Sequence, residues 1–137
     1  MDTNCHKHKV VFLGPAGAGK TSIVMRLMYG SFDPNYMGTI GIDFMSHVLV
    51  VEGRAVRLQI WDTAGQERFK ALIPSYVRGS ACAFLVFDVT SETAENDIRC
   101  WHKLIMHEGN DPLLVLVGNK IDRLVGLLAR GRLFEVH

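Results

Sequence analysis

Residues 14–21 read GPAGAGKT, which fits the pattern Gly-x4-Gly-Lys-Thr. A short apolar run, residues 10–13, precedes this segment, and apolar residues at helical spacing follow from Thr21. Glycines allow backbone amides to turn inward around anionic oxygens, and the start of a helix adds a positive dipole end. The pattern predicts a buried strand, a phosphate-binding loop and a helix. We expect phosphates on Ala16, Gly17, Ala18, Gly19, Lys20, Thr21 and Ser22.

The rest of the chain alternates between strand-like and helix-like segments. Strands are expected over residues 40–51, 56–61, 81–87 and 113–117, with a turn at Glu52 and Gly53. A short helix is expected near Pro74, and a longer helix capped by Ser91 is expected to carry the apolar stripe of Ile98, Trp101 and Ile105. This order predicts an α/β fold with a mostly parallel sheet and helices on both faces.

Composition limits the class of protein. A chain of 137 residues with 48% apolar residues is the size of one folded domain. A net charge of +1 argues against a strongly basic nucleic-acid binder, so we expect no nucleic-acid partner. Three cysteines cannot form a disulfide framework, which favours a reducing, cytoplasmic location.

A second motif, DTAGQE at residues 62–67, follows the expected strand 56–61. Asp62 at the carboxyl end of that strand is suited to hold Mg²⁺ through a water molecule, together with the Thr21 hydroxyl. Gly65 lets a backbone amide approach a γ phosphate, and Gln66 can orient the attacking water. Thr39, in the preceding loop, can supply a second hydroxyl to Mg²⁺.

A third motif, NKID at residues 119–122, follows the expected strand 113–117. The Asp122 carboxylate can accept from two adjacent donors, which guanine presents at N1 and N2 and adenine does not. The Lys120 stem can cover one face of the base, and Asn119 can brace neighbouring loops. Phe32 is either a residue stacked on the base edge or an ordinary core phenylalanine.

With these motifs together, the sequence resembles the small GTPases of the Rab family from about His8 to Asp122. The matching stretches are residues 40–44 (IGIDF), 58–69 (LQIWDTAGQERF) and 76–79 (YVRG). Residues 72–76 (LIPSY), with Phe32, Asp33 and Tyr36, are most similar to the Golgi-associated subgroup.

The resemblance implies a P-loop NTPase fold of the small-GTPase type and a Mg²⁺-dependent GDP/GTP switch that hydrolyses GTP. Its implied partners are effectors, an exchange factor and a GTPase-activating protein, and we expect a monomer. Ile42, Phe44, Trp61 and Tyr76 match the family's effector-binding positions, although the three aromatic residues could instead form a partly buried cluster at the sheet edge. The implied role is vesicle-mediated transport at the cytosolic face of Golgi membranes.

The sequence departs from this family after Asp122. We expect residues 1–8 to be a flexible N-terminus, residues 9–122 an incomplete GTPase domain and residues 123–137 a divergent segment. The family's last strand, its last helix and its prenylated cysteine tail have no counterpart here, so no lipid anchor is expected. One alternative is a truncated, weakly hydrolysing or non-hydrolysing module that competes for Rab effectors. A P-loop kinase is disfavoured by Asp122 and Gln66.

Overall fold

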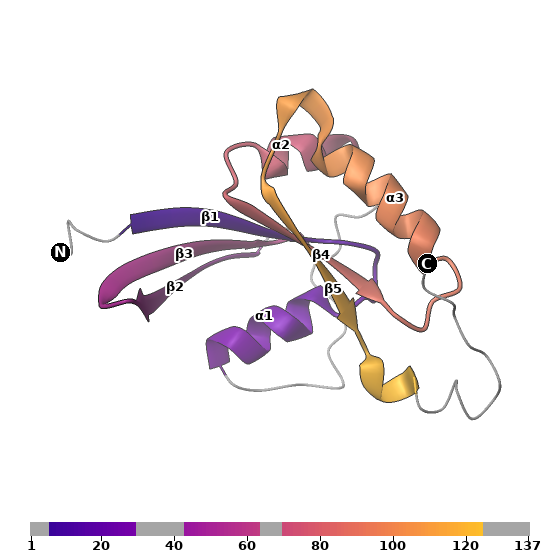
Figure 1. Ribbon diagram of the computed structural model, residues 1–137, viewed down its shortest axis with the longest axis horizontal. Helices are drawn as coiled ribbons and strands as arrows, with labels where there is room; N and C mark the ends of the chain where they lie inside the picture. Colours follow the sequence, from indigo (N-terminus) through magenta and orange to yellow (C-terminus); the bar gives the residue numbers. More distant parts are fainter. Residues whose placement is uncertain (1–5, 30–42, 64–69, 125–137) are drawn as a thin grey trace.

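The computed structural model describes residues 6–29, 43–63 and 70–124 of the chain. Its described helices and strands follow one another in the order that the sequence predicts (Figure 1). The elements are β1 (His6–Leu13), α1 (Lys20–Tyr29), β2 (Asp43–Val51), β3 (Arg54–Asp62), η1 (Lys70–Leu72), α2 (Ile73–Val77), β4 (Cys82–Asp88), α3 (Ala94–Ile105), η2 (His107–Gly109), β5 (Leu113–Asn119) and η3 (Ile121–Arg123).

The described strands form one five-stranded sheet in the order β2-β3-β1-β4-β5. β1 pairs in parallel with β3 and with β4, and β4 pairs in parallel with β5. β2 alone is antiparallel, because it joins β3 through the turn at Glu52 and Gly53. The prediction of a mostly parallel sheet is confirmed.

Helices cover both faces of this sheet (Figure 1). On one face, α2 and α3 bury Ile73, Val77, Trp101 and Ile105 against residues of β1 and β4. On the other face, α1 buries Val24 against residues of β1, β3 and β4. Each parallel strand therefore contributes alternate side chains to two separate hydrophobic clusters, as expected of a sheet with helices on both sides.

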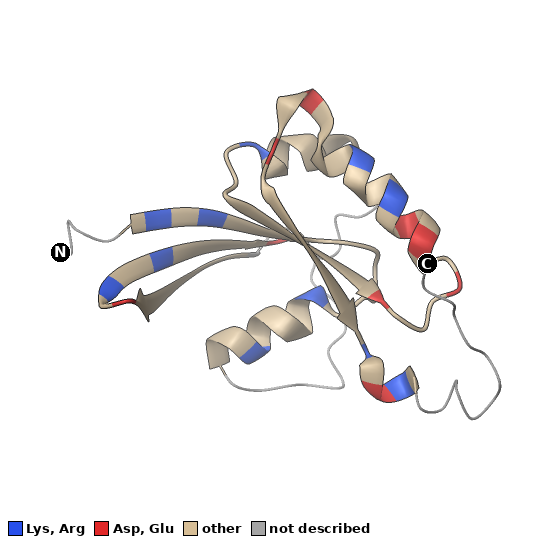
Figure 2. Ribbon diagram, in the orientation of Figure 1, with Lys and Arg blue, Asp and Glu red and all other residues tan. Residues whose placement is uncertain are grey.

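The helix α3 shows how local sequence sets an element. Its first turn contains Glu95 and Asp97, and its last turn contains His102 and Lys103, which complements the helix dipole (Figure 2). The predicted cap is wrong, because the residue before the helix is Thr93 rather than Ser91. The Ser91 amide instead donates to the Asp88 carbonyl at 3.1 Å, so Ser91 belongs to a turn that precedes the helix.

A second correction concerns the N-terminus. Residues 6–8 were expected to be flexible, but they belong to β1, and His6 pairs with Val56 of β3. The polar side chains of this segment are exposed, so it is the backbone ladder that makes it a strand. None of the helices in the described part of the chain is long and apolar enough to cross a membrane.

Candidate functional site

The predicted site residues gather where the parallel strands end. β1 leads into the glycine-rich loop (residues 14–19), β3 ends at Asp62, β4 ends at Asp88 and β5 ends at Asn119. In the strand register, Asp62 lies opposite Phe12 of β1, and Asp88 lies opposite Asn119. The carboxyl ends of parallel strands are where α/β folds place their ligand sites.

Two glycines of the loop permit backbone approaches that no side chain would allow. Gly14 has a φ of 142°, and a Cβ atom there would overlap the backbone carbonyl of Val86 in β4. Gly19 has a φ of 99°, and a Cβ atom there would overlap the amide of Asn119. The glycine-rich loop is therefore held directly against β4 and against the Asn119 side chain at the end of β5.

Lys20, the first residue of α1, lies beneath the loop with only 2% of its surface exposed. Its Nζ donates hydrogen bonds to the carbonyl oxygens of Gly14, at 2.7 Å, and Pro15, at 2.8 Å. A buried ammonium needs such partners, and anionic oxygens would serve it better than carbonyls do. The loop, Lys20 and the start of α1 together form a place suited to bind an anion.

A buried pair of oxygen ligands lies beside Lys20. The Thr21 hydroxyl donates to Oδ2 of Asp62 at 2.5 Å, and both residues are buried. The next residue, Thr63, fixes the end of β3 because its hydroxyl donates to the Phe12 carbonyl at 2.8 Å. Hydroxyl and carboxylate oxygens are the ligands that Mg²⁺ prefers, so this pair fits the predicted metal position. The described residues contain no cluster of three or more His, Cys, Asp or Glu side chains arranged to hold a metal.

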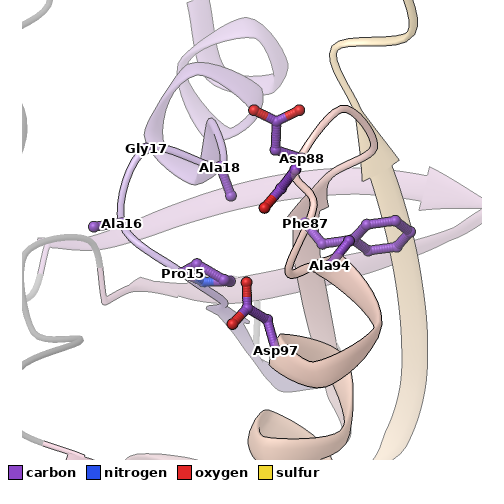
Figure 3. A pocket seen from close by; sticks show the side chains of 9 residues that line it. Pro15, Ala16, Gly17, Ala18, Phe87, Asp88, Ala94 and Asp97 are labelled. Carbon is purple, nitrogen blue, oxygen red and sulfur yellow. The ribbon is translucent and has the colours of Figure 1, made fainter. Parts of the chain in front are cut away.

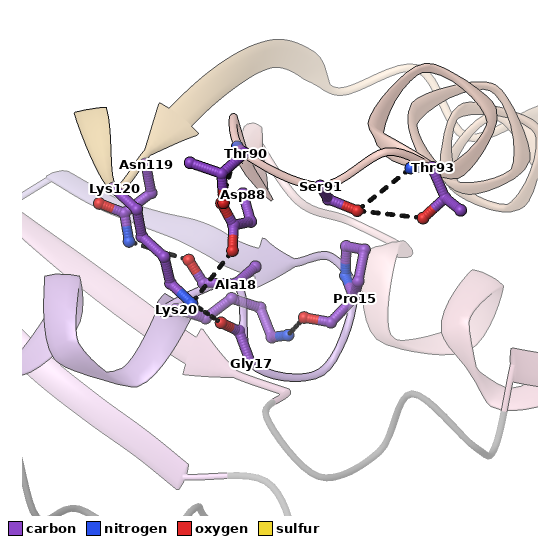
Figure 4. Close-up of polar contacts among 10 residues, drawn as sticks. All are labelled: Pro15, Gly17, Ala18, Lys20, Asp88, Thr90, Ser91, Thr93, Asn119 and Lys120. Carbon is purple, nitrogen blue, oxygen red and sulfur yellow. Dashed lines mark hydrogen bonds and ion pairs between the residues drawn. The ribbon is translucent and has the colours of Figure 1, made fainter. Parts of the chain in front are cut away.

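The NKID segment (residues 119–122) contacts the glycine-rich loop directly (Figure 4). The Asn119 side chain donates to the Ala18 carbonyl at 2.8 Å, and Lys120 Nζ donates to the Gly17 carbonyl at 2.5 Å. Asn119 thus braces the loop as predicted. Asp122 lies in the short helix η3 with its side chain exposed, free to meet a ligand from solvent.

Asp88 is a residue that the sequence reasoning missed. Its carboxylate lies 3.2 Å from Lys120 Nζ and accepts hydrogen bonds from the Thr90 amide and the Thr90 hydroxyl. Burial alone would raise the pKa of Asp88, but the bonds from Thr90 and Lys120 outweigh burial and hold this pKa below its ordinary value. The signal available in the sequence was an Asp-x-Thr pattern at the end of a strand, which is typical of a side chain that bonds the backbone two residues later.

A small cavity opens between the glycine-rich loop and the start of α3 (Figure 3). Its volume is about 110 Å³, and its wall includes Gly17, Asp88, Ser91 and Asp97. Sites for small molecules usually measure ~300–1,000 Å³, so this cavity is too small to hold a nucleotide. It lies beside the loop and does not include Lys20, Thr21 or Asp122.

Two of the predicted effector-binding residues lie together on the sheet. Phe44 of β2 is directly opposite Trp61 of β3, and their rings meet edge to face with centroids 5.1 Å apart. Phe44 is 52% exposed, whereas Tyr76 of α2 is partly buried against the core beneath α2 and α3. Lys9 Nζ lies 5.2 Å from the centre of the Trp61 ring, and other basic residues lie along β1 and β3 (Figure 2). Burial lowers the pKa of Lys9.

Five predicted site residues lie outside the described residues. They are Phe32, Thr39 and Ile42, which precede β2, and Gly65 and Gln66, which follow β3. Ser22 and Ala16 are described: Ser22 is partly buried in α1, and Ala16 is exposed at the tip of the glycine-rich loop.

Comparison with known families gives one match over most of the chain. Residues 9–125 match the model of the family described as the Ras family. The matched range includes the glycine-rich loop, Asp62 and the NKID segment, so it contains every described residue that the geometry brings together at the strand ends.

Proposed function

The chain belongs to the Ras family, and we propose that it is a guanine-nucleotide switch of the Rab type that hydrolyses GTP to GDP. Membership in the family accounts for the P-loop fold of small GTPases and for a GTP-binding switch in general. The narrower proposal concerns which residues bind each part of the nucleotide, how this chain hydrolyses GTP and which partners it meets.

The single observation that carries the proposal is the physical joining of the three motifs. Asn119 and Lys120 donate hydrogen bonds to the glycine-rich loop, and Thr21, in the first turn of α1 after that loop, donates to Asp62. Groups suited to a base, to phosphates and to a divalent cation therefore lie along one edge of the sheet. A nucleoside diphosphate or triphosphate with its metal ion presents these three chemistries together.

Asp122 supports guanine as the base. Asp122 is exposed in η3, directly after Asn119 and Lys120, the two residues that contact the glycine-rich loop. A carboxylate can accept from the adjacent N1 and N2 donors of guanine, and adenine would leave it unpaired. Lys120 would cover one face of the base with its aliphatic stem.

Thr21 and Asp62 would hold Mg²⁺, with Thr39 as a further oxygen ligand. When bound, Mg²⁺ supplies neutralisation of the charge on the β and γ phosphates. Lys20 would bind the phosphates by replacing a hydrogen bond to a loop carbonyl with one to a phosphate oxygen, whose negative charge attracts the ammonium more strongly. The backbone amides of residues 16–22 and of Gly65 would surround the remaining oxygens.

Hydrolysis would depend mainly on positioning and on stabilisation of charge. Gln66 would orient the attacking water, and an arginine from an activating partner would stabilise the transferred phosphoryl group. A strong general base in this chain is not required. Gln66→Leu should therefore slow GTP hydrolysis by more than about tenfold while GTP binding stays nearly unchanged.

The Rab assignment rests on the aromatic positions and the stretches around them. Exposed Phe44 packs edge to face on the partly buried Trp61, and such an aromatic pair is suited to anchor a protein partner. We propose that Ile42, Phe44, Trp61 and Tyr76 bind effectors, and that the chain acts in vesicle-mediated transport at the cytosolic face of Golgi membranes. The same pair favours one alternative, a module that binds effectors with little or no hydrolysis.

The test is a competition binding assay with radioactive GDP. The purified 137-residue chain is loaded with tritiated GDP and challenged with GTP, ATP or xanthosine triphosphate in the presence of Mg²⁺. We expect GTP to displace GDP at least ~100-fold more effectively than ATP, and EDTA to accelerate release. Equal competition by ATP would refute the guanine assignment. Retained GTP without turnover, with or without an activating protein, would favour the non-hydrolysing alternative.

A further inference from the structure

We propose that Asp88 is a positioning residue of the nucleotide site, which acts through Lys120 to hold the NKID segment against the glycine-rich loop and thereby slows nucleotide release. Asp88 ends β4 directly opposite Asn119 of β5. The amide of the next residue, Val89, donates to the Asn119 carbonyl at 3.1 Å. The backbone of Asp88 is thus fixed beside the NKID segment. The proposal rests on the proposed function, since it concerns nucleotide release.

The two oxygens of the Asp88 carboxylate have different partners (Figure 4). Oδ1 accepts from the Thr90 amide at 2.9 Å and from the Thr90 hydroxyl at 2.6 Å. Oδ2 lies 3.2 Å from Lys120 Nζ. Because Thr90 fixes the orientation of the carboxylate, Oδ2 is already directed at the ammonium before any ligand binds.

Lys120 connects Asp88 to the glycine-rich loop. Its Nζ donates to the Gly17 carbonyl at 2.5 Å while it pairs with Asp88. The side chains of Lys120 and Asp88 are only 24% and 22% exposed, so water screens this pair less than a surface pair. Without Asp88, one hydrogen bond to a carbonyl would have to hold a long and flexible side chain in place.

Simple electrostatics makes the opposite prediction. The Asp88 carboxylate borders the cavity beside the glycine-rich loop, and a negative charge there repels an anionic ligand. Removing the charge would then slow nucleotide release. If Asp88 acts by positioning Lys120, removing the charge should accelerate release. The sign of the change distinguishes the two roles.

The experiment measures GDP release from Asp88→Asn and from a matched control, Asp97→Asn. Asp97 borders the same cavity, but its carboxylate accepts a hydrogen bond from the Thr93 hydroxyl, at 2.9 Å, and not from Lys120. The control therefore reports the effect of removing one negative charge from the cavity. We expect release to be about fivefold faster in Asp88→Asn, as for loss of a partly buried charge-assisted bond, and unchanged or slower in Asp97→Asn.

A double-mutant cycle tests whether the effect passes through Lys120. In a Lys120→Gln background, Asp88→Asn should change GDP release by less than about 1.5-fold, because the partner is already gone. A fivefold effect that persists in this background would overturn the proposal, as would unchanged or slower release in Asp88→Asn alone. Thr90→Val, which keeps the carboxylate and removes one of its hydrogen bonds, should accelerate release in the same direction by a smaller factor.

A second readout needs no nucleotide. Reductive methylation of the nucleotide-free chain, mapped by mass spectrometry, reports how freely each lysine reacts, with exposed Lys103 of α3 as internal reference. We expect Lys120 to react on the order of threefold faster in Asp88→Asn, with Lys103 unchanged, because a bonded ammonium reacts slowly. If the chain binds no guanine nucleotide, the proposed function fails. The methylation result still decides this proposal: unchanged Lys120 reactivity overturns it.

Discussion

The two sides of the nucleotide site differ in how deeply their polar groups are built into the fold. On the phosphate side, Lys20, Thr21 and Asp62 are 2%, 8% and 0% exposed, and each is hydrogen-bonded within the protein. On the base side, Lys120 is partly exposed and Asp122 of η3 is exposed. The polar side chains of the phosphate side are therefore buried with the core, whereas those of the base side lie at the protein surface.

This difference has a physical cause. Thr21 lies in the first turn of α1, which packs on one face of the sheet, and Asp62 ends the inner strand β3. Both residues are buried, and burial of their polar atoms is tolerable only when those atoms are paired. Asp122 follows β5, which forms one edge of the described sheet and leaves Leu113 and Leu116 exposed. Substitutions on the phosphate side should therefore affect folding as well as binding, and substitutions on the base side should affect binding alone.

The largest expected effect follows from Gly14→Ala on the phosphate side. The added Cβ would overlap the Val86 carbonyl, at a φ that alanine rarely adopts. Together these should lower the free energy of unfolding by about 3 kcal/mol or more. The matched control is Gly53→Ala, which has a φ of 77° but no atom within 4 Å of the added Cβ, and should cost only ~1 kcal/mol. Urea unfolding of both variants measures the two losses of unfolding free energy. Equal losses would show that the loop is not packed against β4.

Asp62→Asn should have the next largest effect. The amide keeps an acceptor for the Thr21 hydroxyl but removes the charge that favours a divalent cation. We expect the Mg²⁺ concentration needed for half-maximal GDP retention to rise about 100-fold. Release of labelled GDP across a Mg²⁺ titration measures this. An unchanged midpoint would remove Asp62 from the metal site.

The same substitution on the base side sharpens the contrast. Asp122→Asn should weaken guanine-nucleotide binding by tens-fold and improve xanthine-nucleotide binding relative to it, because xanthine has a carbonyl at C2 where guanine has an amine. Since Asp122 is exposed, the free energy of unfolding of the nucleotide-free chain should change by less than about 0.5 kcal/mol. Competition binding and urea unfolding together test this. A large loss of stability would mean that the base side is also part of the core.

Much of the fold and of the described site was predictable because both depend on local patterns. A strand that ends in a glycine-rich loop, or in Asp62, or in Asn119, places those residues at one edge of a parallel sheet. The contact of Asp88 with Lys120 was not predictable in this way, since it depends on β4 and β5 being neighbours in register. The start of β1 at His6 depends likewise on pairing with β3, and local composition there is polar. Ser91 was predicted as a cap from residue type alone, which does not reveal the turn onto Asp88.

The smallest expected effect is a pH dependence at the boundary of the two sides. Hydrogen bonds from Thr90 and Lys120 keep the pKa of Asp88 in the folded chain below the unfolded value of about 3.8. A carboxyl group with a lowered pKa contributes stability that is complete above its unfolded pKa and is lost as the pH falls through its folded pKa. The difference in unfolding free energy between the wild type and Asp88→Asn should therefore be constant from pH 7 to 5 and shrink below pH ~4. Urea unfolding at pH 7, 5 and 3.5, with Asp97→Asn as the control for removal of an aspartate from the same cavity, measures it. A difference that does not change with pH would show that the Asp88 charge contributes nothing to holding the base side on the loop.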